Sequence, residues 1–262
     1  MANSDPHNIE RQWQELLDSQ RSLVIASVHT RNLGGNYTFF FRDKIIRKIA
    51  PRPVSIVKIE FDKEHCEAVA KKDSSRGARL TIHGAMLREL QRFLPRNSLC
   101  LLIDMDAYPL SELAIKLTFI LASIYGLSGN IQRTNCINNG EHLFIGPSYL
   151  CFSHELLLSQ VNTPWIINER SDVGEEICWK LSLLPDKNFF RPNKTIFAPL
   201  WPLEGEQKVY GIGTTFNFQN TPISYHHFFS RNAIGRLHFM LISAFYYLLI
   251  ILDTMQKPIP VY

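Results

Sequence analysis

The chain has 262 residues, of which 45% are apolar, 11% aromatic and 20% charged. This composition is typical of a globular protein and excludes a disordered, collagen-like or coiled-coil chain. The 28 Lys and Arg residues against 24 Asp and Glu residues leave a net charge of +4, which suits an anionic ligand or an acidic membrane surface. Because no basic stripe interleaved with aromatic residues is found, nucleic acid is not expected as a partner.

The cysteines and the N-terminal residues bear on the compartment. The five cysteines are scattered and form no C-x-x-C pair, which disfavours a disulfide framework and a structural zinc site. The first 14 residues are polar and lack the apolar core of a signal peptide. These features predict a cytoplasmic protein.

The first 130 residues alternate between predicted helices and strands. Helices are expected at residues 8–18, before Pro51 and over 77–94, and buried strands at 23–28, 53–59 and 99–103. The alternation predicts an α/β fold with a mainly parallel central sheet, right-handed crossovers and flanking helices. Ligands of such sheets bind beyond the carboxyl ends of the strands.

The second half has a more mixed pattern. Extended runs are expected at residues 143–145, 195–198 and 209–212, and a helix near 174–184. No linker separates this part from the first half. The sequence therefore predicts a single domain over residues 1–262.

An apolar segment at residues 237–252 predicts a C-terminal helix. Its sixteen residues are short of the roughly 20 needed to span a bilayer. Apolar residues surround most of its sides, which favours a soluble protein whose helix is core or the interface of a homodimer. The flanking Arg231, Arg236 and Lys257 keep contact with a membrane surface as the alternative.

The sharpest local pattern is the pair Asp104 and Asp106, which follows the apolar run at residues 99–103. Two acids spaced i, i+2 at the end of a strand can bring both carboxylates to one hard cation, such as Mg²⁺ or Mn²⁺. The alternative is a solvated acidic loop in which Ser111 or Asp106 caps the helix that begins near Glu112. The preceding apolar strand favours the metal site.

At these residues the sequence resembles the glycosyltransferases of the GT-A fold, whose D-x-D motif follows a buried strand and is often followed by Pro-Leu, here Pro109-Leu110. Residues 144–157 resemble the segment that such enzymes place beside the donor sugar. The resemblance spans residues 22–231. It implies a GT-A-like, Rossmann-type fold, with a nucleotide-binding half at 1–130 and an acceptor-side half at 131–262 that carries the apolar helix.

The resemblance also implies a cofactor and its ligands. In this family the acid pair, here Asp104 and Asp106, holds Mn²⁺ or Mg²⁺ on the diphosphate of a nucleoside-diphosphate sugar. A histidine from the C-terminal part often adds a further ligand, and His226 or His227 would supply it here. Neutral imidazole suits Mn²⁺ as a ligand.

A second acidic cluster consists of Asp172, Glu175 and Glu176. It resembles the helix start that supplies the catalytic base in inverting family members, and the two glutamates are the favoured bases. The flanking Trp165 and Trp179 would offer faces for sugar rings. Compensation of the helix dipole is the alternative explanation of these acids.

The remaining site residues are expected to contact the nucleotide. They are Thr30, Arg31, Asp62, Arg79 and Arg231. The loop that begins at Thr30 matches neither G-x-G-x-x-G nor a P-loop, so its contact is expected from the resemblance alone. Arg231 could fork onto phosphate oxygens, and a solvated loop is the alternative for the turn that contains Arg79.

These features together predict a metal-dependent glycosyltransferase that moves a sugar from a nucleoside-diphosphate sugar to a hydroxyl of a glycan, lipid or protein acceptor. The first alternative is a non-catalytic interaction protein, apposed to a membrane, whose acids only cap helices. The second is a metal-dependent phosphohydrolase, which is disfavoured because Ala107 and Tyr108 stand where that pattern has Gly and Thr or Val. The enzyme hypothesis requires that Asp104, Asp106 and one of the two histidines converge.

Overall fold

A computed structural model of the chain describes residues 6–30, 39–73, 79–133, 143–161, 164–168, 171–184, 191–200, 213–227 and 233–256. The helices are α1 (Pro6–Asp18), α2 (Phe40–Ile49), α3 (Lys63–Asp73), α4 (Ile82–Phe93), α5 (Glu112–Tyr125), α6 (His154–Gln160), α7 (Glu175–Ser182), α8 (Pro192–Thr195) and α10 (Ala233–Gln256). The strands are β1 (Ser22–Thr30), β2 (Ser55–Phe61), β3 (Arg79–Leu80), β4 (Ser98–Ile103), β5 (Ala107–Pro109), β6 (Leu127–Arg133), β7 (Leu143–Ser153), β8 (Ile166–Ile167), β9 (Ile196–Pro199), β10 (Thr214–Phe218) and β11 (Thr221–His226).

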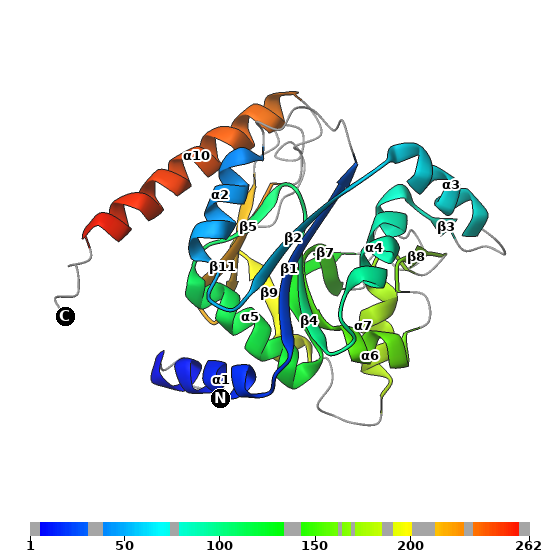
Figure 1. The fold of residues 1–262 in the computed structure, drawn as a ribbon, viewed down its shortest axis with the longest axis horizontal. Helices are drawn as coiled ribbons and strands as arrows, with labels where there is room; N and C mark the ends of the chain where they lie inside the picture. Colours follow the sequence, from blue (N-terminus) through cyan, green and yellow to red (C-terminus); the bar gives the residue numbers. More distant parts are fainter. Residues whose placement is uncertain are drawn as a thin grey trace.

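Nine strands form one strongly curled sheet in the order β2-β1-β4-β7-β6-β9-β10-β11-β5, flanked by helices (Figure 1). β3 and β8 pair separately. Within the sheet, strands from the first half of the chain occupy both edges, because β2 lies at one end and β5 at the other. The two halves of the sequence are therefore interleaved through one hydrogen-bonded layer.

The expectation of a mainly parallel sheet is wrong. β1 is parallel to β2 and β4, and β6 is parallel to β9, but the remaining neighbours in the nine-stranded sheet are antiparallel. Only residues 134–142 connect β6 to β7, fewer than the dozen or more that a parallel crossover needs. A two-residue turn joins β10 to β11, where Gln219 and Asn220 have φ of 46° and 68°, as the favoured hairpin turn requires.

β4 occupies the centre of the molecule and is buried at every position. Its side chains alternate between two apolar clusters, because successive residues of a strand point to opposite faces. Leu101 and Ile103 belong to the cluster covered by α1, α2, α5 and α10, whereas Cys100 and Leu102 belong to the one covered by α3, α4, α6 and α7. The end of β4 is thus held from both sides of the sheet.

Strands were expected at the positions of β1, β2 and β4, and the structure confirms them, but β2 is not buried as expected. It lies at the edge of the sheet, and Ile56 is 36% exposed. α3 was not expected, because small residues, Cys66 and Ala70, form its buried side in place of a large apolar stripe. α4 begins at Ile82, later than the predicted residue 77.

The C-terminal helix α10 has 24 residues, eight more than its apolar segment. One face packs on the core, with Phe239 and Ser243 at 0% exposure and the Tyr246 hydroxyl donating to the Leu110 carbonyl. The expected packing on the core holds for this face. The opposite face is exposed in the single chain, and a homodimer interface there stays a prediction. In the described part of the chain, α10 is long and apolar enough to cross a membrane by length and composition alone.

Candidate metal centre

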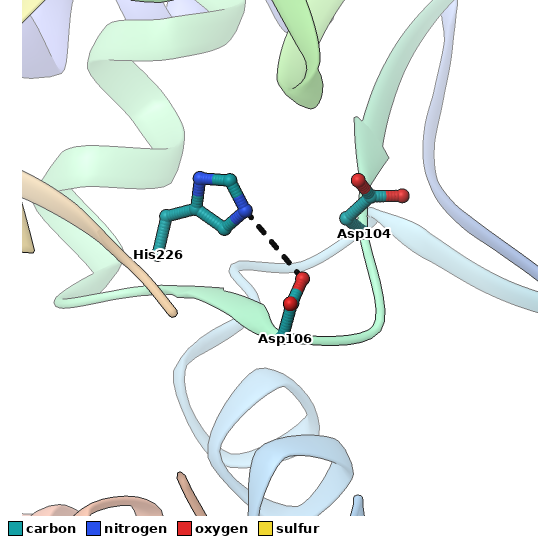
Figure 2. Close-up of side chains that lie close together, drawn as sticks. All are labelled: Asp104, Asp106 and His226. Atoms are coloured by element: carbon teal, nitrogen blue, oxygen red, sulfur yellow. Dashed lines mark ion pairs between the residues drawn. The ribbon is translucent and has the colours of Figure 1, made fainter. Parts of the chain in front are cut away.

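The two acids of the D-x-D motif lie on a tight turn that follows β4. The Ala107 N–H donates to the Asp104 carbonyl at 3.2 Å and closes the turn. The Asp104 N–H donates to the Ser148 carbonyl of β7 at 3.0 Å, so the start of the turn is tied to the neighbouring strand. Because the chain leaves extended geometry here, the carboxylates of Asp104 and Asp106 come to the same side (Figure 2).

The pairing of β5 with β11 brings the histidine to this turn. Ala107 is opposite His226 in the antiparallel register, and the His227 N–H donates to the Asp106 carbonyl at 2.8 Å. The His226 imidazole therefore lies beside the carboxylate of Asp106, with 3.5 Å between Nε2 and Oδ1 (Figure 2). Residues 120 positions apart in the sequence form one cluster.

Asp104, Asp106 and His226 have the geometry of a cation site. One ligand atom from each lies within 4.8 Å of the others. The side chains are 29%, 15% and 9% exposed, respectively, so the cluster is recessed but open at Asp104. Two carboxylates and one imidazole suit Mn²⁺ or Mg²⁺, and three protein ligands leave coordination positions for substrate oxygens.

The electrostatics of the cluster also favour a cation. Burial raises the pKa of Asp104, and the charge of Asp106 raises it further. His83, His226 and Arg42 act in the opposite direction, yet the pKa of Asp104 stays above its usual value. Burial, together with Asp106, therefore disfavours the ionised form of Asp104, and a bound divalent ion would favour it.

Arg42 of α2 holds the backbone of the turn. Its side chain is 2% exposed, its Nη2 donates to the carbonyls of Ile103 and Asp104, both at 3.0 Å, and its Nε donates to the Ala107 carbonyl at 3.1 Å. Asp43 accepts from Nη1 at 2.8 Å and balances the charge. We call this set of hydrogen bonds from Arg42 the clamp. Because the clamp binds carbonyl groups at both ends of the turn, it fixes the backbone conformation that positions the side chains of Asp104 and Asp106.

Sequence reasoning missed Arg42, although a signal for it exists. Arg42, Ile45, Ile46 and Ile49 follow helical spacing and are the buried residues of α2. A cation on the apolar face of a helix must find buried acceptors. That spacing marks Arg42 as a structural residue but does not reveal that its acceptors are the carbonyls of the acidic turn.

His83 is a second residue that sequence reasoning did not place at the site. It lies in the first turn of α4, and its Nε2 is 3.4 Å from Oδ1 of Asp104. Thr81 caps this helix by accepting from the Gly84 N–H at 3.0 Å. His83 thus approaches Asp104 from a different element than His226 does, and it suits the role of a group that orients a ligating carboxylate.

His227 lies next to the cluster but is directed away from it. Its Nε2 is 2.9 Å from Nδ1 of His238 on α10, and the residue is 0% exposed. Burial, together with the neighbouring His238, lowers the pKa of His227 to about 4, so the ring is neutral at pH 7. Of the two predicted histidines, the structure brings His226 to the acid pair and uses His227 to dock α10.

The second acidic cluster makes local hydrogen bonds. Glu175 is 1% exposed, and its Oε2 accepts from the Asp172 N–H at 2.8 Å. Glu176 Oε1 accepts from Asn168 Nδ2 at 2.9 Å and from Ser171 Oγ at 3.2 Å. These contacts organise the loop before α7, as acids at a helix start commonly do. A catalytic role for Asp172, Glu175 or Glu176 stays a prediction.

The start of α7 and the metal centre border the same segment of β7. Gly174 has a φ of 84°, and a Cβ placed there would lie 3.9 Å from Cδ of Pro147. The next residue, Ser148, accepts the Asp104 N–H. The two flanking tryptophans differ, because Trp165 is buried and donates to Gln91, whereas Trp179 is 42% exposed.

The residues predicted to contact a nucleotide are only partly described. Asp62 caps α3, since its Oδ1 accepts from the Glu64 N–H at 2.8 Å. Thr30 is the last residue of β1 and Arg79 the first of β3, and their backbone alone is described. Arg31 and Arg231 lie outside the described residues.

Comparison with known proteins adds no further assignment. No family model matches the chain, and no match was found among curated proteins or among solved structures. The functional argument therefore depends on the geometry of the site.

Proposed function

We propose that this chain is a metal-dependent glycosyltransferase that uses a nucleoside-diphosphate sugar. The observation that carries the proposal is the convergence of Asp104, Asp106 and His226 at the carboxyl end of the central strand. A divalent ion bound there would neutralise the charge that develops on the leaving diphosphate. The two aspartates bind the ion through oxygen, and His226 adds a nitrogen ligand from the C-terminal half.

The capping of α5 decides between the two residues that the solvated-loop alternative offered as the helix cap. Ser111 caps this helix, because its Oγ accepts from the Ala114 N–H at 3.0 Å. Asp104 and Asp106 precede the cap and lie on a separate turn. The cap is thus Ser111, one of the two residues that the solvated-loop alternative allowed, and Asp106 is not needed as a cap. Support for the metal site comes from the approach of His226 to Asp106 and not from the cap.

An acceptor hydroxyl needs a base, and we propose that the second acidic cluster of Asp172, Glu175 and Glu176 supplies it. Glu175 is buried and bonded to the Asp172 backbone, and Glu176 accepts from two side chains of its own loop. Asp172 Oδ1 likewise accepts from the Val173 N–H at 2.7 Å, so all three acids are tied to the start of α7. Asp172 precedes α7, which borders the β7 segment next to Asp104. A carboxylate at this position can accept the hydroxyl proton as the glycosidic bond forms.

Calorimetry with nucleoside diphosphates tests the proposal. The wild-type protein is expected to bind a nucleoside diphosphate in the presence of Mn²⁺ and not in the presence of EDTA. The double variant Asp104→Asn/Asp106→Asn is expected to lose this binding and to keep its circular dichroism spectrum. Asp62→Asn serves as a control, because Asp62 is an exposed acid that caps α3. Binding that persists without metal, or in the double variant, would refute the metal assignment.

A turnover assay separates glycosyl transfer from phosphate hydrolysis. With nucleoside-diphosphate sugars and Mn²⁺, the proposal expects slow release of the nucleoside diphosphate and free sugar by transfer to water. Release of inorganic phosphate from the nucleoside diphosphate would instead favour the phosphohydrolase. Metal binding without any nucleotide affinity would contradict both activities.

A further inference from the structure

The helix α10 exposes a continuous apolar stripe. Large apolar side chains on this helix are 44% to 74% exposed: Ile234, Leu237, Leu241, Phe245, Leu248, Leu249 and Leu252. At 3.6 residues per turn they fall within about 120° of the helix circumference. Figure 1 shows α10 lying over α2, with its C-terminal half extending past the sheet. The stripe therefore faces solvent along the length of the helix.

The opposite face of α10 is bound to the protein. Phe239 and Ser243 are fully buried, and the Phe239 ring lies 6.2 Å from that of Phe39 and 6.0 Å from that of Tyr108. The helix is about 36 Å long at 1.5 Å per residue, enough to cross a bilayer. Because the N-terminal half of α10 is docked on the body of the protein, lipid cannot surround that half, and a position parallel to a membrane surface would cover the whole stripe.

Cationic side chains of α2 lie beside this helix. The Phe41 ring is 6.1 Å from the ring of Tyr247 on α10. Lys44 and Lys48 follow Phe41 at i+3 and i+7, which places them on the same face of α2, and both are exposed. Lys44 Nζ also lies 5.4 Å from the ring centre of Phe40, which is 49% exposed. The contact between the two helices is thus bordered by positive charge and an exposed aromatic ring.

We propose that α10 and the adjacent face of α2 form a binding surface for an anionic lipid bilayer. The apolar stripe enters the boundary between headgroups and acyl chains, and Lys44 and Lys48 contact lipid phosphates. Charge distinguishes this partner from a second copy of the chain. α10 carries one acid, Asp253, at its far end, so pairing with the α10 of a second copy would bring little negative charge to these lysines. The inference does not depend on the proposed activity.

Flotation with lipid vesicles tests this surface on the full chain. The wild-type protein is expected to float with phosphatidylcholine vesicles that contain about one third phosphatidylglycerol, and less with phosphatidylcholine alone. Raising the salt concentration is expected to weaken the binding. The absence of flotation with anionic vesicles would overturn the proposal.

Two pairs of substitutions localise the binding. Leu241→Glu/Phe245→Glu is expected to lower the affinity for anionic vesicles by at least about tenfold, because two apolar anchors are lost. The matched control is Phe93→Glu/Leu183→Glu, which makes the same change at side chains 70% and 66% exposed, at the ends of α4 and α7. Equal loss in the control would place the binding elsewhere. Circular dichroism verifies that each variant is folded.

Charge and oligomeric state decide between the remaining occupants. Lys44→Glu/Lys48→Glu is expected to remove the preference for anionic vesicles and to leave the weaker binding to phosphatidylcholine. Light scattering without lipid is expected to show the same mass for the wild type and for Leu241→Glu/Phe245→Glu. If the wild-type protein is a dimer that does not bind vesicles, and the variant is a monomer, the stripe is the contact with a second copy of the chain. Protein that stays in the membrane fraction after extraction with alkaline carbonate would show that α10 spans the bilayer.

Discussion

The two acidic clusters look alike in the sequence and differ in the structure. Asp104 and Asp106 follow a strand, Glu175 and Glu176 begin a helix, and each pair lies within three residues. In the structure the carboxylates of the first pair lie near each other and near an imidazole from a distant strand. Those of the second pair accept hydrogen bonds from their own loop.

The two clusters differ in which side chains cap the helix that follows. At α5 a serine accepts the N–H group of Ala114, so the preceding acids are not needed there. The N-cap residue of α7 is Gly174, which has no side chain to accept a hydrogen bond from the helix. Here Glu175 and Glu176 accept hydrogen bonds from the preceding loop. Acids near a helix start are therefore stronger candidates for a metal site when another residue already provides the cap.

The largest effect is expected at Arg42, which supports the first cluster and has no counterpart at the second among the residues that the structure describes. Arg42→Met should lower the free energy of unfolding by about 3–5 kcal/mol, because buried acceptors and Asp43 lose their cation. Arg47→Met, an exposed position on the same helix, is the control and should change stability by less than about 0.5 kcal/mol. Urea denaturation measures both. Similar stabilities for the two variants would show that the clamp is not needed.

The second prediction separates the clusters by metal affinity. Asp106→Asn should weaken Mn²⁺ binding by more than about 100-fold, because it removes a charged ligand of the proposed site. Loss of a residue that only orients a ligand has a smaller effect. Glu176→Gln should leave the Mn²⁺ affinity within about twofold, because Glu176 bonds to Asn168 and Ser171. Calorimetric titration of the two variants with Mn²⁺ measures the ratio. Equal losses would mean that the two clusters hold the ion jointly.

The local part of the site could be predicted from the sequence. Five consecutive apolar residues ending in two acids predict a buried strand and a turn with two carboxylates, and β4 with its turn has this structure. The choice between His226 and His227 could not be made in the same way. It depends on the register of β5 against β11, and a shift of one residue moves every side chain to the other face.

The sequence also could not predict which strands are antiparallel or which side chains hold the acidic turn, and the reason is related. The short connection at residues 134–142 requires β7 to run antiparallel, but only once β6 and β7 are known to be neighbours. The carbonyl groups that accept from Arg42 lie more than 60 positions away, and His83 meets Asp104 across 21 positions. Such contacts depend on the completed fold rather than on local spacing.

The third prediction compares the two clusters by their effect on stability in the absence of metal, where we expect the second cluster to have the larger effect. Glu175→Ala should lower the free energy of unfolding by about 1–3 kcal/mol, because it removes the acceptor of the buried loop before α7. Asp106→Asn should leave stability unchanged or raise it slightly, since it relieves the repulsion between neighbouring carboxylates. Urea denaturation in EDTA tests the pair. A larger loss for Asp106→Asn would make the first cluster structural.

The smallest effect concerns Asp43, an acid that belongs to neither cluster but balances the charge of the clamp. Burial raises the pKa of Asp43, yet the Arg42 guanidinium and the Lys58 ammonium outweigh burial and hold it below its usual 3.8. The folded state therefore binds a proton less readily than the unfolded state. The stability contribution of Asp43 is complete above the unfolded value and is lost as the pH falls through the lowered folded pKa.

Asp43→Asn tests this linkage together with Lys58→Met, which removes the 2.9 Å ion pair. Because Lys58 is 31% exposed, the pair should contribute only about 0.5–1 kcal/mol at neutral pH, and the coupling measured in a double-mutant cycle should disappear in acid. Unfolding free energies from urea titrations between neutral and acidic pH give this coupling directly. A coupling that stays constant down to the lowest pH would show that the interaction between Asp43 and Lys58 does not depend on the ionisation of Asp43.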